Sequence, residues 1–241
     1  MDTPRVGSIL SAVLLAGLLA GLAVGLLHYV AIEPVIEQAI ALEQRTHPAG
    51  DEAPPVVSRD LQRGGLIIGW LLYGLVVGLL FGAAYALVRP RFGTANLLVN
   101  ALLSALVAYW LVALYPFLKY PANPPGVGEA ETIAYRQSLF ILFWVLSIGG
   151  LLAAGWVYRL LRPRTRGTVA WGLAAATYVV WAGALYALMP ANPDPVALPG
   201  ELVATFRVLS LSGLTLFWLL LGAAFGLLLE RFERPAAWHA R

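Results

Sequence analysis

The chain has 241 residues, of which 60% are hydrophobic and only 12% are charged, and its formal net charge is +3. Soluble domains carry about 25% charged residues, so this composition excludes an ordinary soluble globule. The chain has no cysteine, which excludes disulfide frameworks, thiolate metal sites and cysteine nucleophiles.

Six apolar runs of 20 residues or more predict six transmembrane helices, because each can cross a hydrocarbon layer of ~30 Å at 1.5 Å per residue. Arg159, at the end of the fourth run, is the one charged residue in these segments. We therefore expect an all-α polytopic membrane protein in which residues 1–241 form a single membrane domain. The expected spans are residues 8–32, 65–88, 94–118, 138–161, 168–189 and 209–229.

The first span is too long for the apolar region of a signal peptide, so we interpret it as a retained helix. His28 lies near its outer end, and Glu33 and Glu37 follow one helical turn apart. Histidine and carboxylate ligands suit borderline divalent cations, so these three residues are candidate metal ligands. The alternative remains open that His28 only forms a hydrogen bond and that both carboxylates are solvated.

Glycines recur at four-residue spacing in three of the spans, and small residues on one stripe allow helices to pack closely. We expect packed interfaces there, with a substrate path as the alternative. These glycines are Gly17, Gly21, Gly25, Gly74, Gly78, Gly82, Gly222 and Gly226.

Basic residues are unevenly divided between the two sides of the predicted membrane domain. The joints 89–91 and 162–166 combine proline with several arginines, and ten of the sixteen basic residues fall on their side. Because arginine and lysine resist translocation, this side is predicted to be cytoplasmic, with both termini, in a cytoplasmic (inner) membrane. The outer loops are then residues 33–64, 119–137 and 190–208.

An internal repeat links two of the outer loops. The tetrapeptide Pro-Ala-Asn-Pro at 121–124 recurs 69 residues later at 190–193, and each copy is followed by an acid and then an arginine. This order predicts two copies of one helical hairpin, with the first two spans as a diverged third copy. The expected hairpins cover about 8–88, 94–161 and 168–229.

The repeated loops have two interpretations. In one, they are rigid loops in which Arg136 and Arg207 pair with Glu131 or Glu201. In the other, they form a pseudo-symmetric outer vestibule, since irregular backbone is tolerated in a membrane where it lines a cavity. The vestibule residues would be Pro121, Asn123, Pro124, Glu131, Arg136, Pro190, Asn192, Pro193, Asp194 and Arg207.

No Ser-His-Asp set, phosphate-binding loop or intramembrane carboxylate pair is visible in the sequence, so we do not expect an enzyme. The alternatives are a transport subunit, a vitamin- or cofactor-capturing membrane component of a multisubunit transporter, and a membrane scaffold.

Several of these segments together resemble the CbtA family, the larger subunit of a probable cobalt transporter. The resemblance is most specific at 119–128, which is followed by Glu131-Thr132 and Arg136, and continues at 189–194 and Phe206-Arg207. It implies uptake of cobalt ion for cobalamin synthesis, with cobalt as substrate and no permanently bound cofactor.

The same resemblance implies a small single-span partner, CbtB, with a histidine-containing metal motif. The lipid bilayer is the other expected partner, self-association into a homo-oligomer stays open, and nucleic acid is not expected. Only His28, His47 and His239 occur in this chain, fewer than a self-sufficient cobalt binder would display, and a partner that supplies ligands would fill that gap.

Overall fold

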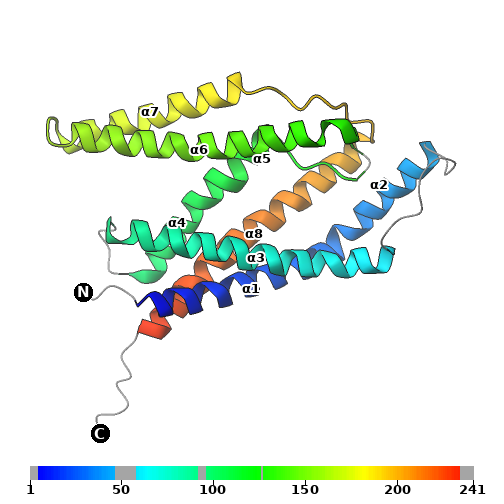
Figure 1. Cartoon of the computed structure of the whole chain (residues 1–241), viewed down its shortest axis with the longest axis horizontal. Helices are drawn as coiled ribbons and strands as arrows, with labels where there is room; N and C mark the ends of the chain where they lie inside the picture. The colour runs from blue at the N-terminus through cyan, green and yellow to red at the C-terminus, as the bar shows by residue number, and fades with distance from the viewer. Residues whose placement is uncertain (1–4, 47–57, 92–95, 126, 234–241) are drawn as a thin grey trace, which may run out of the picture. The chain divides into compact units, whose positions relative to one another are not determined.

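A computed structural model describes residues 5–46, 58–91, 96–125 and 127–233, and these residues form helices and connecting segments with no strand among them (Figure 1). Six helical segments in this part of the chain are long and apolar enough to cross a membrane. The expected all-α polytopic class is therefore confirmed. The six segments are Val6–Ala31, Arg59–Arg91, Leu97–Lys119, Ala130–Leu161, Gly167–Leu188 and Gly200–Glu233.

Several helices continue past the apolar windows that predicted them. Helix α3 (Arg59–Val88) begins six residues before the expected span, and α8 (Gly200–Glu233) begins nine residues before it. Part of the expected outer loop 33–64 is also helical, as α2 (Glu33–Thr46). A helix needs no apolar residue where it leaves the hydrocarbon, so hydropathy locates the span and not the helix end.

The break between α1 (Val6–Ala31) and α2 falls at Ile32, two residues before Pro34. Proline has no backbone N–H, and its ring clashes with the carbonyl four residues earlier, so it cannot continue α1. It is well tolerated in the first turn of the next helix, where α2 places it. This break separates His28, at the end of α1, from Glu33 and Glu37 on α2.

The chain divides into two compact units, which are described one at a time. The first comprises residues 1–109, 123–126 and 198–241, and it holds α1, α2, α3, α4 (Leu97–Tyr109) and α8. Within it, α1 lies against both α3 and α8, and α8 also lies against α4.

The glycine stripes of α1 and α3 form the packed interface that the sequence predicts. A Cβ added to Gly17 would lie 2.2 Å from the carbonyl oxygen of Gly74, and a Cβ on Gly74 would lie 2.1 Å from that of Gly17. The two backbones are thus in direct contact, which only glycine at both positions allows.

The second unit comprises residues 110–122 and 127–197, including α5 (Tyr115–Lys119), α6 (Ile133–Leu161) and α7 (Gly167–Leu188). Its first segment is a π-helix, Trp110–Leu114, which ends two residues before the buried Pro116. The missing N–H of that proline disturbs the α-helical ladder here, and π-bulges are a usual way to absorb such a disturbance.

Side chains of the π-helix and of α5 form hydrogen bonds with α7. Trp110 donates its indole N–H to the hydroxyl of Tyr178 at 2.5 Å, and Tyr115 donates its hydroxyl to the carbonyl of Ala182 at 2.5 Å. Tyr115 also packs with the buried Phe143 of α6. The fifth and sixth expected spans fall in different units, so their pairing as a hairpin, and with it the repeat arrangement, remains a prediction.

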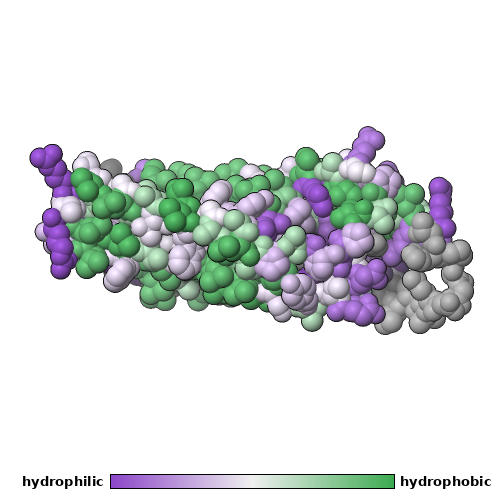
Figure 2. All heavy atoms as spheres, turned by 90° about the horizontal axis from the view of Figure 1, so that it is seen from above, coloured by the Kyte–Doolittle hydropathy of each residue, from purple (hydrophilic) through white to green (hydrophobic). Residues whose placement is uncertain are grey.

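Large apolar side chains stay exposed on the helices, as lipid-facing surfaces require. Val180 is 70% exposed and Leu188 is 82% exposed on α7. Exposing that much apolar surface to water would be unfavourable in free energy. Figure 2 shows apolar residues, in green, over much of the face in view. The multi-pass membrane assignment rests on this surface together with the six long helices.

Candidate functional site

His28 is buried at the end of α1, where both neighbouring helices contact its ring. Its Nδ1 accepts a hydrogen bond from the indole N–H of Trp70 on α3 at 3.1 Å, and the two rings meet edge to face. Because Nδ1 accepts, the proton of the neutral ring lies on Nε2. On the other side, Nε2 faces α8 at Gly213, where an added Cβ would lie only 2.0 Å from it.

Glu33 and Glu37 lie at the start of α2 and face the first turns of α3. The carboxylate of Glu33 contacts Arg59 at 2.5 Å and Arg63 at 3.3 Å, and Arg63 also pairs with Glu37. Glu33 is only 7% exposed, whereas the two arginine side chains are about one third exposed. Two carboxylates are thus balanced by two guanidinium groups at the edge of the membrane domain.

These contacts bear directly on the expected metal ligands. In the described part of the chain, no group of three or more histidine, aspartate or glutamate side chains is arranged to hold a metal ion. His28 lies between α3 and α8, while Glu33 and Glu37 face arginines. The assignment of these three residues as ligands therefore remains a prediction. His47, Asp51 and Glu52, which follow in the same expected outer loop, lie outside the described residues.

In the second unit, the loop residues of the two repeat copies meet at Asp194. Its carboxylate, with a side chain only 3% exposed, pairs with Nε of Arg136 at 3.0 Å. It also accepts hydrogen bonds from the hydroxyl of Thr132 at 2.6 Å and from the backbone N–H of Glu129 at 3.2 Å. One ion pair and two hydrogen bonds from the first copy thus hold one acid of the second.

Gly128 is required for this arrangement. Its φ of +98° lies in the region that favours glycine. A Cβ there would also lie 2.6 Å from Oδ2 of Asp194 and would strike the guanidinium of Arg136. Neither Thr132 nor Gly128 was among the site residues expected from the sequence. Both residues stood in the family-like segment, at 119–128 and at Glu131-Thr132, so the resemblance marked the region but not the role of either residue.

In the first unit, Arg207 of α8 donates to the side-chain oxygen of Asn123 at 2.7 Å. Here an arginine from the second copy contacts the loop of the first, the converse of the Arg136 contact. The simpler expectation paired Arg136 with Glu131. Arg136 instead pairs with Asp194, and Glu131 is exposed.

The remaining loop residues differ between the two copies. Pro124 is fully buried, whereas its counterpart Pro193 is exposed. Pro121 is half-buried, and Asn192 accepts a hydrogen bond from the backbone N–H of Asp194 at 3.1 Å. Because the contacts of the two copies fall in separate units, a common vestibule remains a prediction.

Pro190 accepts a hydrogen bond through its carbonyl from the hydroxyl of Tyr120 at 2.7 Å. Burial, with a smaller contribution from the nearby Tyr135, raises the pKa of Tyr120. The hydroxyl therefore remains a protonated donor to the second Pro-Ala-Asn-Pro loop over the physiological pH range.

Comparison with known proteins identifies one family. Residues 6–230 match the family described as "Probable cobalt transporter subunit (CbtA)", which is nearly the whole chain. No curated protein and no solved structure matches the chain.

Proposed function

Because the chain belongs to the CbtA family of probable cobalt transporter subunits, we propose that it is the membrane-embedded subunit for uptake of cobalt ion across the cytoplasmic membrane. The proposal extends to the use of that cobalt in cobalamin synthesis. It also extends to an orientation with both termini in the cytoplasm, which the arginine-rich joints 89–91 and 162–166 support.

The observation that carries the proposal is the carboxylate pair at the start of α2. Glu33 and Glu37 place two negative charges beside the outer end of α1, where a divalent cation would arrive. Arg59 and Arg63 balance these charges, and their side chains are about one third exposed. The two arginine side chains can therefore rotate toward solvent when a divalent cation binds. The two positive charges of the cation then replace those of the guanidinium groups beside the carboxylates.

We propose His28 as the next ligand that the cation meets. It lies at the end of α1, on the other side of the break at Ile32 from Glu33. Its Nδ1 carries the lone pair that Trp70 engages, so coordination there requires Trp70 to release it. A borderline cation such as Co²⁺ suits a site of one imidazole and two carboxylates, and remaining positions would be filled by water or by a partner.

The family description as a subunit implies a partner chain. We propose a small single-span protein with metal-binding histidines, of the CbtB kind. The chain's small number of histidines supports this, because imidazole is the preferred nitrogen ligand of such cations.

Cobalt accumulation in intact cells tests the proposal. A strain lacking the gene, supplied with trace radioactive cobalt, should accumulate less metal than the parent, and the intact gene should restore uptake. Glu37→Ala should restore it only in part. Gln38→Ala is the matched control, because Gln38 is exposed on the same helix and carries no charge.

Growth that depends on internal cobalamin synthesis provides the second readout. Loss of the gene should impair this growth at trace cobalt, and either excess cobalt or added cobalamin should rescue it. Unchanged metal content on deletion would support a scaffold, and binding of intact cobalamin without binding of cobalt ion would support a vitamin-capturing component. Either result would contradict the proposal.

A further inference from the structure

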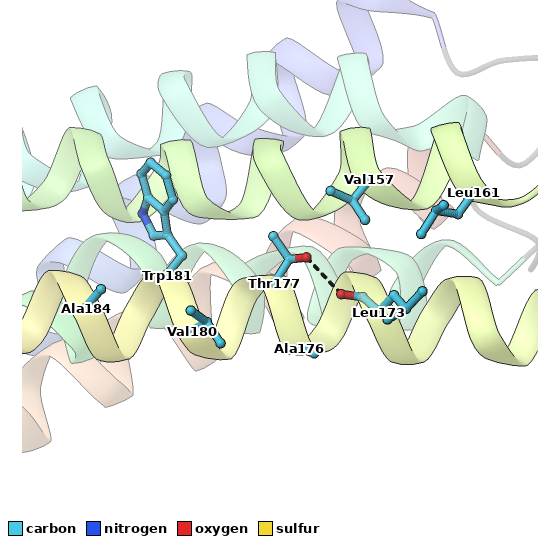
Figure 3. Close-up of a pocket in the computed structure, with 8 residues that line it drawn as sticks. All are labelled: Val157, Leu161, Leu173, Ala176, Thr177, Val180, Trp181 and Ala184. Atoms are coloured by element: carbon cyan, nitrogen blue, oxygen red, sulfur yellow. Dashed lines mark hydrogen bonds between the residues drawn. The ribbon is translucent and has the colours of Figure 1, made fainter.

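An apolar groove runs along α6 and α7 within the second unit (Figure 3). It has a volume of about 580 Å³ and extends from Leu161, the last residue of α6, along α7 from Leu173 to Ala184. At 1.5 Å per residue, the stretch of α7 that lines it is about 16 Å long. This is close to half of a ~30 Å hydrocarbon layer, the depth of one leaflet.

The polar atoms in the groove are already satisfied. Thr177 donates its hydroxyl to the carbonyl of Leu173 at 2.8 Å, as Figure 3 shows. Trp181 donates its indole N–H to the carbonyl of Leu146 at 2.9 Å. The groove therefore offers only apolar contact to an occupant, and hydrogen bonding gives it no further selectivity.

The end of the groove at Leu161 leads directly into the basic turn 162–166. Three arginines of this turn and Arg159 before it are exposed, and no acidic residue occurs in the sequence between Glu131 and Asp194. Within the described part of the chain, the ion pairs involve other arginines. A cationic surface thus adjoins the apolar groove.

Two of these guanidinium groups are held in place while keeping free donors. Arg164 donates one N–H to the carbonyl of Leu160 at 2.6 Å, and Arg162 lies over the ring of Tyr158 at 6.0 Å. Since a guanidinium has five N–H donors, most remain for a ligand. Trp156 and Trp171, both 63% exposed, lie near the same helix ends and are typical of a membrane interface.

We propose that this groove binds an acyl chain of an anionic phospholipid whose phosphate lies on the arginine turn 162–166. The apolar lining accommodates the chain, and the guanidinium groups bind the phosphate oxygens. The length of the groove favours a lipid over a transmembrane helix, because a helix would need contacts across both leaflets. The sequence predicts this end to be cytoplasmic, where anionic lipids are enriched.

Trp181 is a built-in reporter for this test, because its ring lines the groove. The full chain is placed in phosphatidylcholine nanodiscs, and increasing fractions of phosphatidylglycerol brominated on its acyl chains are added. The difference in emission between the wild type and Trp181→Phe isolates the signal of Trp181 from the other tryptophans. We expect half-maximal quenching at a mole fraction about fivefold or more below that needed with brominated phosphatidylcholine.

Two pairs of variants separate the headgroup contact from the groove. Replacing Arg162, Arg164 and Arg166 with glutamine should abolish the preference for the anionic lipid. Arg91→Gln should preserve it, because Arg91 is also exposed and bonded to the carbonyl four residues earlier, but lies in the other basic joint.

Ala176→Phe should fill the groove and reduce quenching by both lipids. Val179→Phe, on a part of α7 that does not line the groove, should have no effect. Circular dichroism and size-exclusion chromatography confirm that each variant is folded.

Three outcomes would overturn the proposal. The first is equal quenching by the two brominated lipids, and the second is an unchanged lipid preference in the triple arginine variant. The third is loss of quenching when a single-span partner is co-expressed, which would assign the groove to a helix. None depends on cobalt, so this test is independent of the uptake experiments.

Discussion

The indole N–H of Trp70 on α3 donates to Nδ1 of His28 on α1 at 3.1 Å, although the two residues are 42 positions apart in the sequence. This bond fixes the ring orientation and directs Nε2 against α8. His28 is therefore a point at which α1, α3 and α8 meet, whether or not it also contacts a cation.

The contact of Nε2 with Gly213 predicts the effect of adding one methyl group. Gly213→Ala places a Cβ against the imidazole and should lower stability by about 1–3 kcal/mol, as overpacking in a core does. Thermal unfolding in detergent measures the loss. Gly183→Ala is the matched control, since its added Cβ meets no atom within 4 Å. Equal stability of the two variants would contradict the close contact, and His28→Ala combined with Gly213→Ala should recover part of the loss.

Two substitutions of His28 separate its structural contribution from a role in uptake. Glutamine supplies an oxygen that can accept from Trp70, whereas alanine leaves the part-buried indole N–H without this acceptor, at a cost of about 1 kcal/mol. We expect His28→Gln to be the more stable variant, and both variants to accumulate less cobalt. Wild-type accumulation by His28→Gln would limit His28 to its hydrogen bond with Trp70.

Neutralising Glu33 should cost more stability than neutralising Glu37. Glu33 is buried and contacts both arginines, so Glu33→Gln leaves two guanidinium groups without this partner and should cost about 1–3 kcal/mol. The side chain of Glu37 is 47% exposed, and Glu37→Gln should cost less than about 1 kcal/mol. Thermal unfolding of the two purified variants tests this order, which the reverse result would refute.

The buried acid at Asp194 should contribute more to stability than the exposed acid nearby. Asp194→Asn removes the charge that Arg136 faces and should destabilise the chain by about 1–3 kcal/mol. Glu131→Gln, at an exposed position of the first copy, should change stability by less than about 0.5 kcal/mol. Denaturation of the second unit can be followed by proteolysis at 127–137, and similar protection in both variants would contradict the prediction.

The six spans could be predicted from the sequence because each depends on a local property, an uncharged run long enough to cross the bilayer. Close packing at Gly17 and Gly74 was likewise predictable from their four-residue periodicity with neighbouring glycines. The start of α3 at Arg59 was not, since polar residues outside the hydrocarbon form helices without a hydropathy signal. The π-helix before Pro116 also gives no pattern of its own beyond that proline.

The candidate site was only partly predictable because its partners are distant in the sequence. Glu33 meets Arg59 and Arg63 after 26 and 30 residues, and Asp194 meets Arg136 after 58. The repeat indicated that Arg136 and Arg207 were important, but a nearby glutamate was the expected partner for each. Which of several charges an arginine contacts depends on the tertiary arrangement, which no local spacing encodes.

The backbone contact between Gly17 and Gly74 limits how the first unit can move. Two helices whose main chains touch have no layer of side chains that could repack as one slides along the other. Helices α1 and α3 should therefore travel as one rigid body in any transport cycle, so Trp70 would release His28 by turning its side chain and not by a shift of α3. Access to a path in this unit would then open between α1 and α8, which meet at Gly213 through the side chain of His28 and not backbone to backbone.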